Sequence, residues 1–247
     1  YSLKSFTQNY TPNDVLPLPT PAPIPILGNI VPPQLTAQGI MIIDIASNTA
    51  IYEKNSTIKL FPASTTKIMT ALVTLDLYKL NDIITIKNVT TDGQSMGLVR
   101  GEKITVENLL YGILVHSAND AAFALAEHAS IGKEGFVEKM NEKAAVLNLK
   151  NTHFTNPAGF DDPNHFTTTA DLSRLTLFAL HNPTIRKIVG ISQITVSDIN
   201  YTNFHSLKNV NELLGKIPGV YGFKTGYTEG AGQSVITTVI KDNHEIL

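Results

Sequence analysis

The stretch FPASTTKIMT, residues 61–70, places Ser64 three positions before Lys67 at the expected start of an apolar helix. Residues three apart lie on one face of a helix, so the lysine amine can reach the serine hydroxyl. A neutral amine there can accept the hydroxyl proton and make the serine a nucleophile. Burial and a second cation would both lower the pKa of the lysine, so such a pair needs an enclosed, electropositive pocket. The same residues also suit a plain helix start with Ser64 as N-cap.

The spacing is not specific, because the sequence contains it twice more. Ser56 and Lys59 lie in a polar connection, and Ser130 and Lys133 lie at a glycine-containing break between expected helices. We interpret both pairs as solvated loop residues. Ser64 differs from them because a proline precedes it and a long apolar helix is expected to follow.

The hydrophobic pattern around this stretch predicts strands at both ends of the chain and helices between them. Strands are expected at residues 38–45, 49–53, 83–86, 220–225 and 234–240, and helices at 64–80, 106–115, 121–129, 136–147 and 170–180. This order favours an α+β fold in which a sheet carries a helical insert.

Residues 1–36 differ in composition from the rest of the chain, since they hold most of its 13 prolines. Alternating prolines favour extended polyproline II, so we predict a spacer here, with a disordered tail as the alternative. The folded domain should then occupy residues 37–247.

Composition excludes several classes of protein. The net charge of −2 offers no excess of positive charge to phosphate, so nucleic acid is not an expected partner. The absence of cysteine excludes disulfides and thiolate metal sites. No uninterrupted apolar run approaches the roughly 18 residues of a membrane-spanning helix.

Two further motifs follow the Ser64–Lys67 pair along the chain. Ser117-Ala118-Asn119 separates two expected helices, and Lys224-Thr225-Gly226 ends an expected strand. The order S-x-x-K, S-x-N, K-T-G is the signature of penicillin-binding proteins and serine β-lactamases.

The flanking residues narrow this assignment, because the sequence resembles the low-molecular-mass D-alanyl-D-alanine carboxypeptidases from residue 37 to residue 240. The matching stretches are PASTTKIMTALV (62–73), SMGLVRGEKITVENLLYGILVHSANDAA (95–122), FTNPAGFDDPNHFTTTADLSRL (154–175) and NELLGKIPGVYGFKTGYTEGAG (211–232). The resemblance implies a β-lactamase/transpeptidase-like fold with an antiparallel sheet flanked by helices. The sheet part would comprise about 37–86 and 191–247 and the helical part about 87–190, with the active site between them.

The resemblance also implies a role for each motif residue. Ser64 would attack the carbonyl between the two terminal D-alanines of a peptidoglycan stem peptide, and Lys67 would be the general base. Ser117 would relay a proton to the leaving amine, and Asn119 would orient Lys67 and the substrate backbone. Hydrolysis through an acyl-enzyme requires no metal or organic cofactor, and β-lactams would bind covalently at the same serine.

The substrate would bind along the last motif. By resemblance, Lys224 and Thr225 hold its free carboxylate, and Gly226 leaves room for the peptide to lie in β-fashion on the strand edge. The oxyanion hole would comprise the backbone N–H groups of Ser64 and Tyr227.

Several rival motifs are interpreted as structural. Residues 93–97 match G-x-S-x-G, but a nucleophile elbow needs a helix directly afterwards, and Leu98 to Gly101 cannot open one. The Y-x-N motif at residues 201–203 falls close to the final sheet rather than between helices. His116, beside Ser117, is expected to be packed or half-exposed at a helix end.

One cluster could be taken for a cation site. It contains Asp161, Asp162, Asn164 and His165. Pro163 in its midst favours instead a turn held by Asx hydrogen bonds.

Other activities of the same fold remain open. Endopeptidase or transpeptidase activity would use the same groups, and a penicillin-sensing or wall-binding module would keep acylation without turnover. A class A β-lactamase would need a loop glutamate, and residues 160–170 contain none.

The resemblance further implies a protein exported to the periplasm or to the outer face of the cytoplasmic membrane, with any membrane anchor outside this chain. Relatives continue beyond residue 247 through a strand into a helix packed on the sheet. We therefore expect a truncated C-terminus and an open sheet edge next to residues 234–240.

Overall fold

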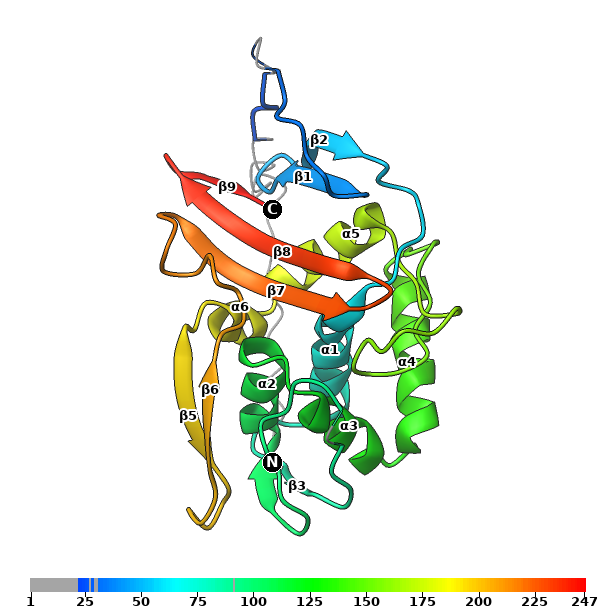
Figure 1. Ribbon diagram of the computed structural model, residues 1–247, viewed down its shortest axis with the longest axis vertical. Coiled ribbons are helices and arrows are strands. Elements are labelled where there is room, and N and C mark those ends of the chain that lie inside the picture. The colour runs from blue at the N-terminus through cyan, green and yellow to red at the C-terminus, as the bar shows by residue number, and fades with distance from the viewer. Residues whose placement is uncertain (1–21, 27, 29–30, 91) are drawn as a thin grey trace, which may run out of the picture.

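Five antiparallel strands from the two ends of the sequence form one sheet in the computed structural model, which describes residues 22–26, 28, 31–90 and 92–247 (Figure 1). The order across the sheet is β2-β1-β9-β8-β7. The strands are β1 (Ile40–Asp44), β2 (Thr49–Lys54), β7 (Val220–Thr228), β8 (Gly232–Lys241) and β9 (His244–Ile246). The fold class expected from the sequence, α+β with an antiparallel sheet, is confirmed.

The short strand β9 joins the two halves of this sheet. It pairs with β8 on one side, where Ile246 faces Val239, and with β1 on the other, where Ile246 faces Asp44. Two backbone hydrogen bonds between Ile43 and Leu247, of 2.8 and 2.9 Å, extend the second pairing. The partner strand that the sequence was expected to lack next to β8 is therefore present in short form.

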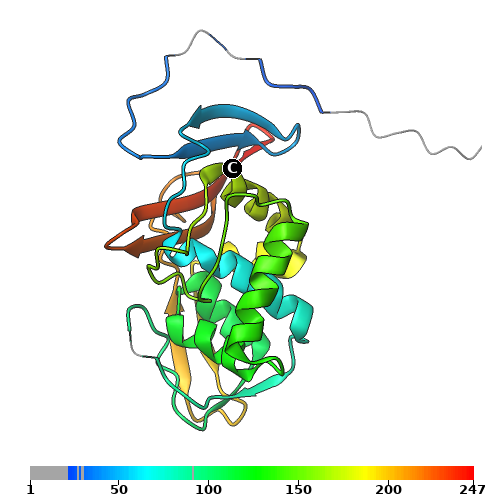
Figure 2. The same cartoon turned by 90° about the vertical axis from the view of Figure 1, so that its right-hand side faces the viewer.

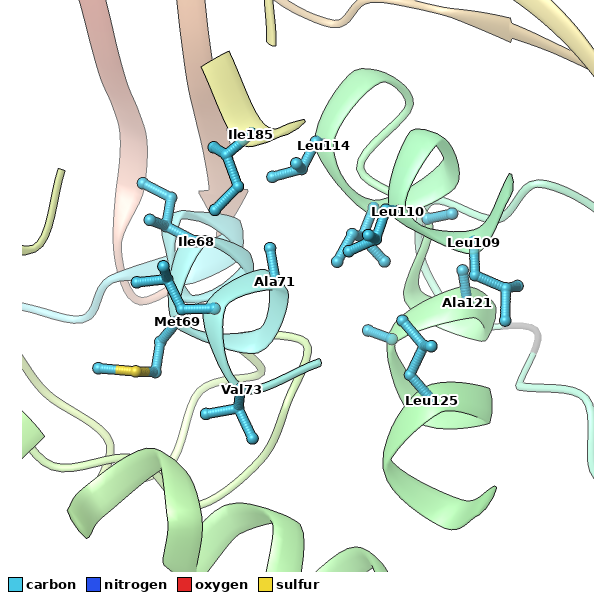
Figure 3. Packing of buried hydrophobic residues seen from close by; sticks show 14 of the residues in the cluster. Ile68, Met69, Ala71, Val73, Leu109, Leu110, Leu114, Ala121, Leu125 and Ile185 are labelled. Carbon is cyan, nitrogen blue, oxygen red and sulfur yellow. The ribbon is translucent and has the colours of Figure 1, made fainter. Parts of the chain in front are cut away.

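Helix α1 (Lys67–Leu77) lies at the centre of the helical part and follows directly on the 3₁₀ turn η1 (Ala63–Thr66). Its first eight residues are all buried, polar ones included, because neighbouring helices surround it. These neighbours are α2 (Val106–Val115), α3 (Asn119–His128), α4 (Gly132–Val146) and α5 (Thr169–Leu180), and α6 (Pro183–Val189) packs on α2 and α5. Figure 3 shows side chains of α1, α2, α3 and α6 that meet in one shared core.

Side chains cap the N-termini of three of these helices. Thr105 accepts a hydrogen bond from the Asn108 backbone N–H at the start of α2, and Thr168 accepts one from the Asp171 N–H at the start of α5. The side-chain oxygen of Asn182 accepts two backbone N–H groups at the start of α6. Such caps satisfy N–H groups that the helix itself leaves without partners.

All the expected helices and strands are present, and all except α2 have ends that differ from the expected ones. Helix α3 begins at Asn119, two residues earlier than expected, so Asn119 belongs to the helix itself. Four elements were missed because each is short: β4 (Lys103–Thr105), α6, β5 (Gln193–Ser197) and β6 (Phe204–Lys208).

The missed strands change the expected extent of the sheet part. Strand β3 (Ile83–Thr85) pairs with β4, and β5 pairs with β6, so both pairs form separate two-stranded sheets. In Figure 1 the β5–β6 hairpin extends beside α2 and α6, away from the five-stranded sheet. The pairing of β3 with β4 crosses the expected boundary at residue 86, whereas β5 and β6 both follow residue 190, and the expected domain boundaries stay predictions.

Most of the predicted spacer lies outside the described residues. The parts of 22–36 that are described have no regular secondary structure and are mostly exposed, outside the packed elements (Figure 2). The Lys54 amine donates a hydrogen bond to the Leu35 carbonyl at 2.8 Å, where this segment approaches the domain. Over the described ranges, no helix combines the length and apolarity that crossing a membrane would require.

Candidate active site

The 3₁₀ turn η1 presents Ser64 where strand β7 meets the helical part. Ala63 has a φ of +48°, a left-handed conformation that is uncommon for a residue with a side chain. Ser64 is half-buried, whereas Lys67, one turn later, is 0% exposed. The Lys67 Nζ lies 2.8 Å from the Ser64 Oγ, so the pair that opened the sequence analysis is in direct contact.

Three oxygens surround the amine of Lys67. Besides Ser64, it contacts the side-chain oxygen of Asn119 at 2.7 Å and the backbone carbonyl of Ala158 at 2.8 Å. The Asn119 amide presents its oxygen to Lys67 because its nitrogen donates to the Asp92 carbonyl at 2.8 Å. Both the amide oxygen and the carbonyl can only accept hydrogen bonds.

The charge on Lys67 decides what it can do to Ser64. A neutral amine has two N–H groups and one lone pair. If the N–H groups go to Asn119 and Ala158, the lone pair is left for the Ser64 hydroxyl proton. A charged ammonium would instead donate to all three oxygens and could not act as a base.

The surroundings favour the neutral amine. Burial lowers the pKa of Lys67 well below its ordinary value, and the positive charge of Lys224 lowers the pKa further. The carboxylate of Asp120 acts in the opposite direction. The burial and the second cation that the pair was expected to need are therefore both present at Lys67.

The S-x-N motif forms a tight turn between α2 and α3. Ser117 has a φ of +62°, and the Ala118 N–H donates to the Gly112 carbonyl at 2.9 Å. The backbone N–H of Asn119 donates to the Gln94 carbonyl at 2.7 Å. Ser117 and Asn119 are both buried, and each one contacts a lysine of the site.

Strand β7 brings Lys224 to the same place. Lys224 is 1% exposed, and its Nζ donates to the Ser117 Oγ at 2.8 Å and to the Thr225 carbonyl at 2.7 Å. Burial lowers the pKa of Lys224 to about 7. The hydrogen-bond partners of both site lysines are uncharged groups.

Gly226 allows β7 to pass directly beside Ser64. A Cβ at this position would lie 2.7 Å from the Ser64 backbone nitrogen and 3.0 Å from the Ala63 Cβ. Any larger residue would therefore separate β7 from η1. Thr225, before this glycine, is half-buried and Tyr227, after it, is 66% exposed, so this end of the strand borders solvent.

The contact between Lys67 and the loop that carries Ala158 was not predicted from the sequence. The side-chain oxygen of Asn156 accepts the backbone N–H groups of residues 158, 159 and 160 at 3.2, 2.7 and 3.0 Å, and so folds this loop. Gly159 has a φ of +93°, and a Cβ there would overlap the Ala63 carbonyl oxygen. The Asn-Pro-Ala-Gly sequence signals a turn, but it does not reveal that a carbonyl of this turn contacts Lys67.

His165 has a structural role in this loop. Its Nδ1 accepts the Thr155 backbone N–H at 3.0 Å, so its Nε2 carries the proton and donates to the Thr66 Oγ1 at 2.9 Å. Burial lowers the pKa of His165 to about 4, which keeps the ring neutral. This hydrogen bond fixes the η1 turn at Thr66, between Ser64 and Lys67.

The carboxylates of Asp161 and Asp162, which the sequence offered as part of a cation site, accept hydrogen bonds from protein groups instead. Asp162 accepts the Asn164 N–H at 2.7 Å in the expected Asx turn. Asp161 accepts the Thr228 hydroxyl at 2.7 Å and the Gly230 N–H at 2.9 Å, and so joins the loop to the β7–β8 turn. Across the described residues, no group of three or more His, Asp or Glu side chains is arranged to hold a metal ion.

The other rival motifs lie in loops. Residues 93–97 form an irregular segment in which the Ser95 hydroxyl donates to Asp120 at 2.7 Å. Tyr201 is 74% exposed in the turn between β5 and β6. His116 is half-buried at the end of α2, where its ring contacts the Gln94 side chain and the backbone of residue 208 rather than Ser117.

The two other S-x-x-K pairs are not paired in space. The Ser56 hydroxyl donates to Glu53 at 2.6 Å, and Lys59 lies 4.0 Å from the centre of the Phe166 ring. Ser130 is exposed, and Lys133 lies 3.8 Å from Glu134. Tertiary contacts therefore distinguish Ser64–Lys67 from pairs of the same spacing.

Comparisons with known proteins agree with this arrangement. A family model described as D-alanyl-D-alanine carboxypeptidase matches residues 28–247. The chain is 36% identical over 214 residues to the D-alanyl-D-alanine carboxypeptidase DacF of Bacillus subtilis, which covers 84% of the chain. It is 33% identical over 226 residues, 87% of the chain, to DacA of Haemophilus influenzae. The matched segments span only 55% and 56% of the lengths of these two relatives.

Solved structures match over more of their length. The Streptomyces K15 DD-transpeptidase has a TM-score of 0.83 at 30% identity, with 88% of this chain and 90% of that chain covered. An evolved penicillin-binding protein homologue of Mycobacterium tuberculosis also has a TM-score of 0.83 at 30% identity, with 89% and 84% covered.

Proposed function

The chain belongs to the D-alanyl-D-alanine carboxypeptidase family, and on that premise we propose that it is a serine-type D-Ala-D-Ala carboxypeptidase with Ser64 as its nucleophile. Its substrate would be the peptidoglycan stem peptide that ends in D-Ala-D-Ala. One observation carries the proposal: the buried Lys67 amine lies 2.8 Å from the Ser64 hydroxyl, and two fixed acceptors take its N–H groups.

Acylation begins with proton transfer. The Lys67 lone pair accepts the Ser64 proton while Oγ bonds to the carbonyl carbon of the penultimate D-alanine. The carbonyl oxygen becomes an oxyanion, and the backbone N–H groups of Ser64 and Tyr227 stabilise it. The close approach of β7 to Ser64 at Gly226 supports this pairing of donors.

Collapse of the tetrahedral intermediate releases the terminal D-alanine. Its amine must gain a proton as the C–N bond breaks. Ser117 relays that proton: its oxygen accepts the Lys224 N–H, its hydroxyl hydrogen passes to the amine, and the proton that Lys67 took from Ser64 replaces it. Lys67 is then neutral again and accepts a proton from the water that attacks the ester. This proton passes to the Ser64 oxygen as the ester bond breaks, which frees the shortened peptide and restores Ser64.

The terminal carboxylate selects the substrate. Lys224 in its charged form, together with the Thr225 hydroxyl, binds the carboxylate by charge-assisted hydrogen bonds. The backbone edge of β7 pairs with the substrate backbone. β-Lactams, which carry a carboxylate at a similar distance from a reactive carbonyl, acylate Ser64 in the same orientation. Such a reaction belongs outside the cytoplasm, in the periplasm or at the outer face of the membrane, where peptidoglycan is found.

The test is D-alanine release from a diacylated peptide ending in D-Ala-D-Ala, with Ser64→Ala as the matched protein. The parent protein should release D-alanine and Ser64→Ala should release none. Release that persists in Ser64→Ala would overturn the proposal. Covalent labelling by penicillin without D-alanine release would identify a sensor, and rapid β-lactam turnover a β-lactamase.

Transpeptidation is the second candidate, because the similar solved structure from Streptomyces K15 is a DD-transpeptidase. In this reaction an amine, rather than water, attacks the acyl-enzyme. Adding a free amino acid or peptide amine to the assay separates the two: a carboxypeptidase gives mainly hydrolysed product, and a transpeptidase gives the aminolysis product.

A further inference from the structure

We propose that Asp120 is a positioning residue of this site: its buried carboxylate gathers the loop of residues 95–98 and so fixes Asn119 against Lys67. The proposal rests on the proposed function, since it concerns how that reaction's base is held. It assigns Asp120 no contact with the substrate.

The carboxylate of Asp120 is surrounded by donors. One oxygen accepts the backbone N–H groups of Met96 at 3.0 Å and Ala121 at 2.9 Å. The other oxygen accepts the Ser95 hydroxyl at 2.7 Å and the N–H groups of residues 97 and 98, both at 3.0 Å. With 1% exposure, Asp120 is a buried carboxylate whose five hydrogen-bond donors are all uncharged.

The loop held by Asp120 also holds Asn119. The Gln94 carbonyl accepts the Asn119 backbone N–H, and the Asp92 carbonyl accepts its side-chain N–H. The fit is close, because a Cβ on Gly93 would lie 2.7 Å from the Asn119 Nδ2. Residues 92–94 therefore set the orientation of the amide that faces Lys67, and Asp120 anchors the next four residues of the same loop.

Asp120 also acts on Lys67 through its charge. The charged groups that act on the Lys67 amine are Lys224 and Asp120, and only Asp120 favours its protonated form. Asn119 and Asp120 are adjacent in the first turn of α3, and each acts on Lys67 in a different way. The amide orients the lone pair of Lys67, and the carboxylate limits how far its pKa falls.

Glu102 offers a matched control. It is a second buried carboxylate at the other end of the same loop, where it accepts the Val99 N–H at 2.9 Å and lies 2.7 Å from the His205 Nε2. Glu102 is not among the charges that shift Lys67. Both substitutions weaken the hydrogen bonds that hold this loop, but only the one at Asp120 also changes a charge that acts on Lys67. Comparing the two variants therefore separates the effect of loop stability from the effect on Lys67.

The experiment compares Asp120→Asn with Glu102→Gln in the full chain. Each variant replaces a carboxylate by an amide of nearly the same shape and so removes a negative charge. At position 120 the amide offers one acceptor oxygen, whereas the five donors are now divided between two carboxylate oxygens. The readouts are the rate of Ser64 acylation by penicillin from pH 4 to pH 9, and the thermal midpoint. The Cε chemical shift of Lys67 in ¹³C-lysine-labelled protein, assigned with Lys67→Arg, reports the same titration without activity.

We expect Asp120→Asn to acylate about tenfold more slowly or worse, since small misplacements of catalytic groups can cost up to about 100-fold. The acid limb of its rate profile and the Lys67 titration should both move to lower pH. Glu102→Gln should lose thermal stability and keep the parent acid limb and titration. If Asp120→Asn matches Glu102→Gln in all three readouts, the proposal is wrong and Asp120 only stabilises the loop.

Two safeguards keep the test decisive. If Asp120→Asn does not fold, Ser95→Ala removes a single donor and keeps the charge. It should acylate about two- to fivefold more slowly with an unchanged acid limb, and a parent-like rate would overturn the proposal. A parent protein that forms no acyl-enzyme would refute the proposed function alone, because the chemical-shift titration still tests Asp120.

Discussion

The amine of Lys224 donates a hydrogen bond to the hydroxyl of Ser117 at 2.8 Å, across 107 positions of sequence. This contact joins strand β7 to the turn between α2 and α3, and so joins the sheet to the helical part. Lys224 is buried without a carboxylate among its hydrogen-bond partners, and its positive charge lowers the pKa of Lys67. One side chain therefore both links the two parts of the fold and acts on the Lys67 amine.

Lys224→Met should lose acylation by a D-Ala-D-Ala peptide far more than it loses stability. A charge-assisted hydrogen bond to the substrate carboxylate contributes roughly 1.5–3 kcal/mol, so the acylation rate should fall about 10- to 100-fold. The methionine fills the same space without a buried amine, so the thermal midpoint should not fall. Stopped-flow acylation and circular dichroism check this, and equal acylation rates in the two proteins would remove Lys224 from the site.

The pH profile of kcat/KM should have an alkaline limb near pH 7. The pKa of Lys224 is about 7 in the free protein, so its positive charge is present below that pH and lost above it. A bound carboxylate favours the charged form, so the limb in kcat alone should lie at higher pH. Steady-state assays from pH 5 to pH 9 measure both. A limb near pH 7 that persists in Lys224→Met would have to come from another group.

Folding stability should rise with pH above pH 7 because of Lys224. In the unfolded chain this group keeps its proton up to its ordinary pKa of 10.5, whereas in the folded protein it loses the proton near pH 7. Between these values the unfolded state binds more protons, so this group adds up to about 1.4 kcal/mol of unfolding free energy per pH unit. Urea unfolding at pH 7 and pH 9 should show a smaller rise in Lys224→Met. Identical slopes in the two proteins would contradict the lowered pKa.

Gly159→Ala should damage the site, and Gly101→Ala should not. Both glycines have positive φ, +93° and +87°, so alanine strains each backbone by about 1 kcal/mol. At Gly159 the new Cβ would overlap the Ala63 carbonyl oxygen. At Gly101 no atom lies within 4 Å of the position that a Cβ would take. Gly159→Ala should therefore unfold at lower urea than Gly101→Ala and acylate more slowly, because the Ala158 carbonyl leaves Lys67. Equal effects in both variants would mean that only backbone strain matters.

Local patterns explain what could be predicted. The helix 106–115 was predicted with its observed ends, because its apolar run is bounded by a capping threonine and by the polar residues after Val115. The short pieces, α6 and the strands β4, β5 and β6, were missed because three to seven residues carry too little periodicity to distinguish them from loops. Asn119 was expected before a helix and instead begins one, and this explains why its side chain is fixed.

The sequence by itself determined the α+β class and the presence of three motifs in order, because residue type and local spacing carry that information. Only the tertiary structure decided that Ser64 and Lys67, of three S-x-x-K pairs, are in contact around a buried amine, since spacing encodes neither burial nor neighbouring charge. It also showed that the Ala158 carbonyl contacts Lys67, that His165 contacts Thr66, and that the charge of Asp120 acts on Lys67. These contacts join segments about 50 to 100 residues apart, and only the packing of the whole chain brings them together.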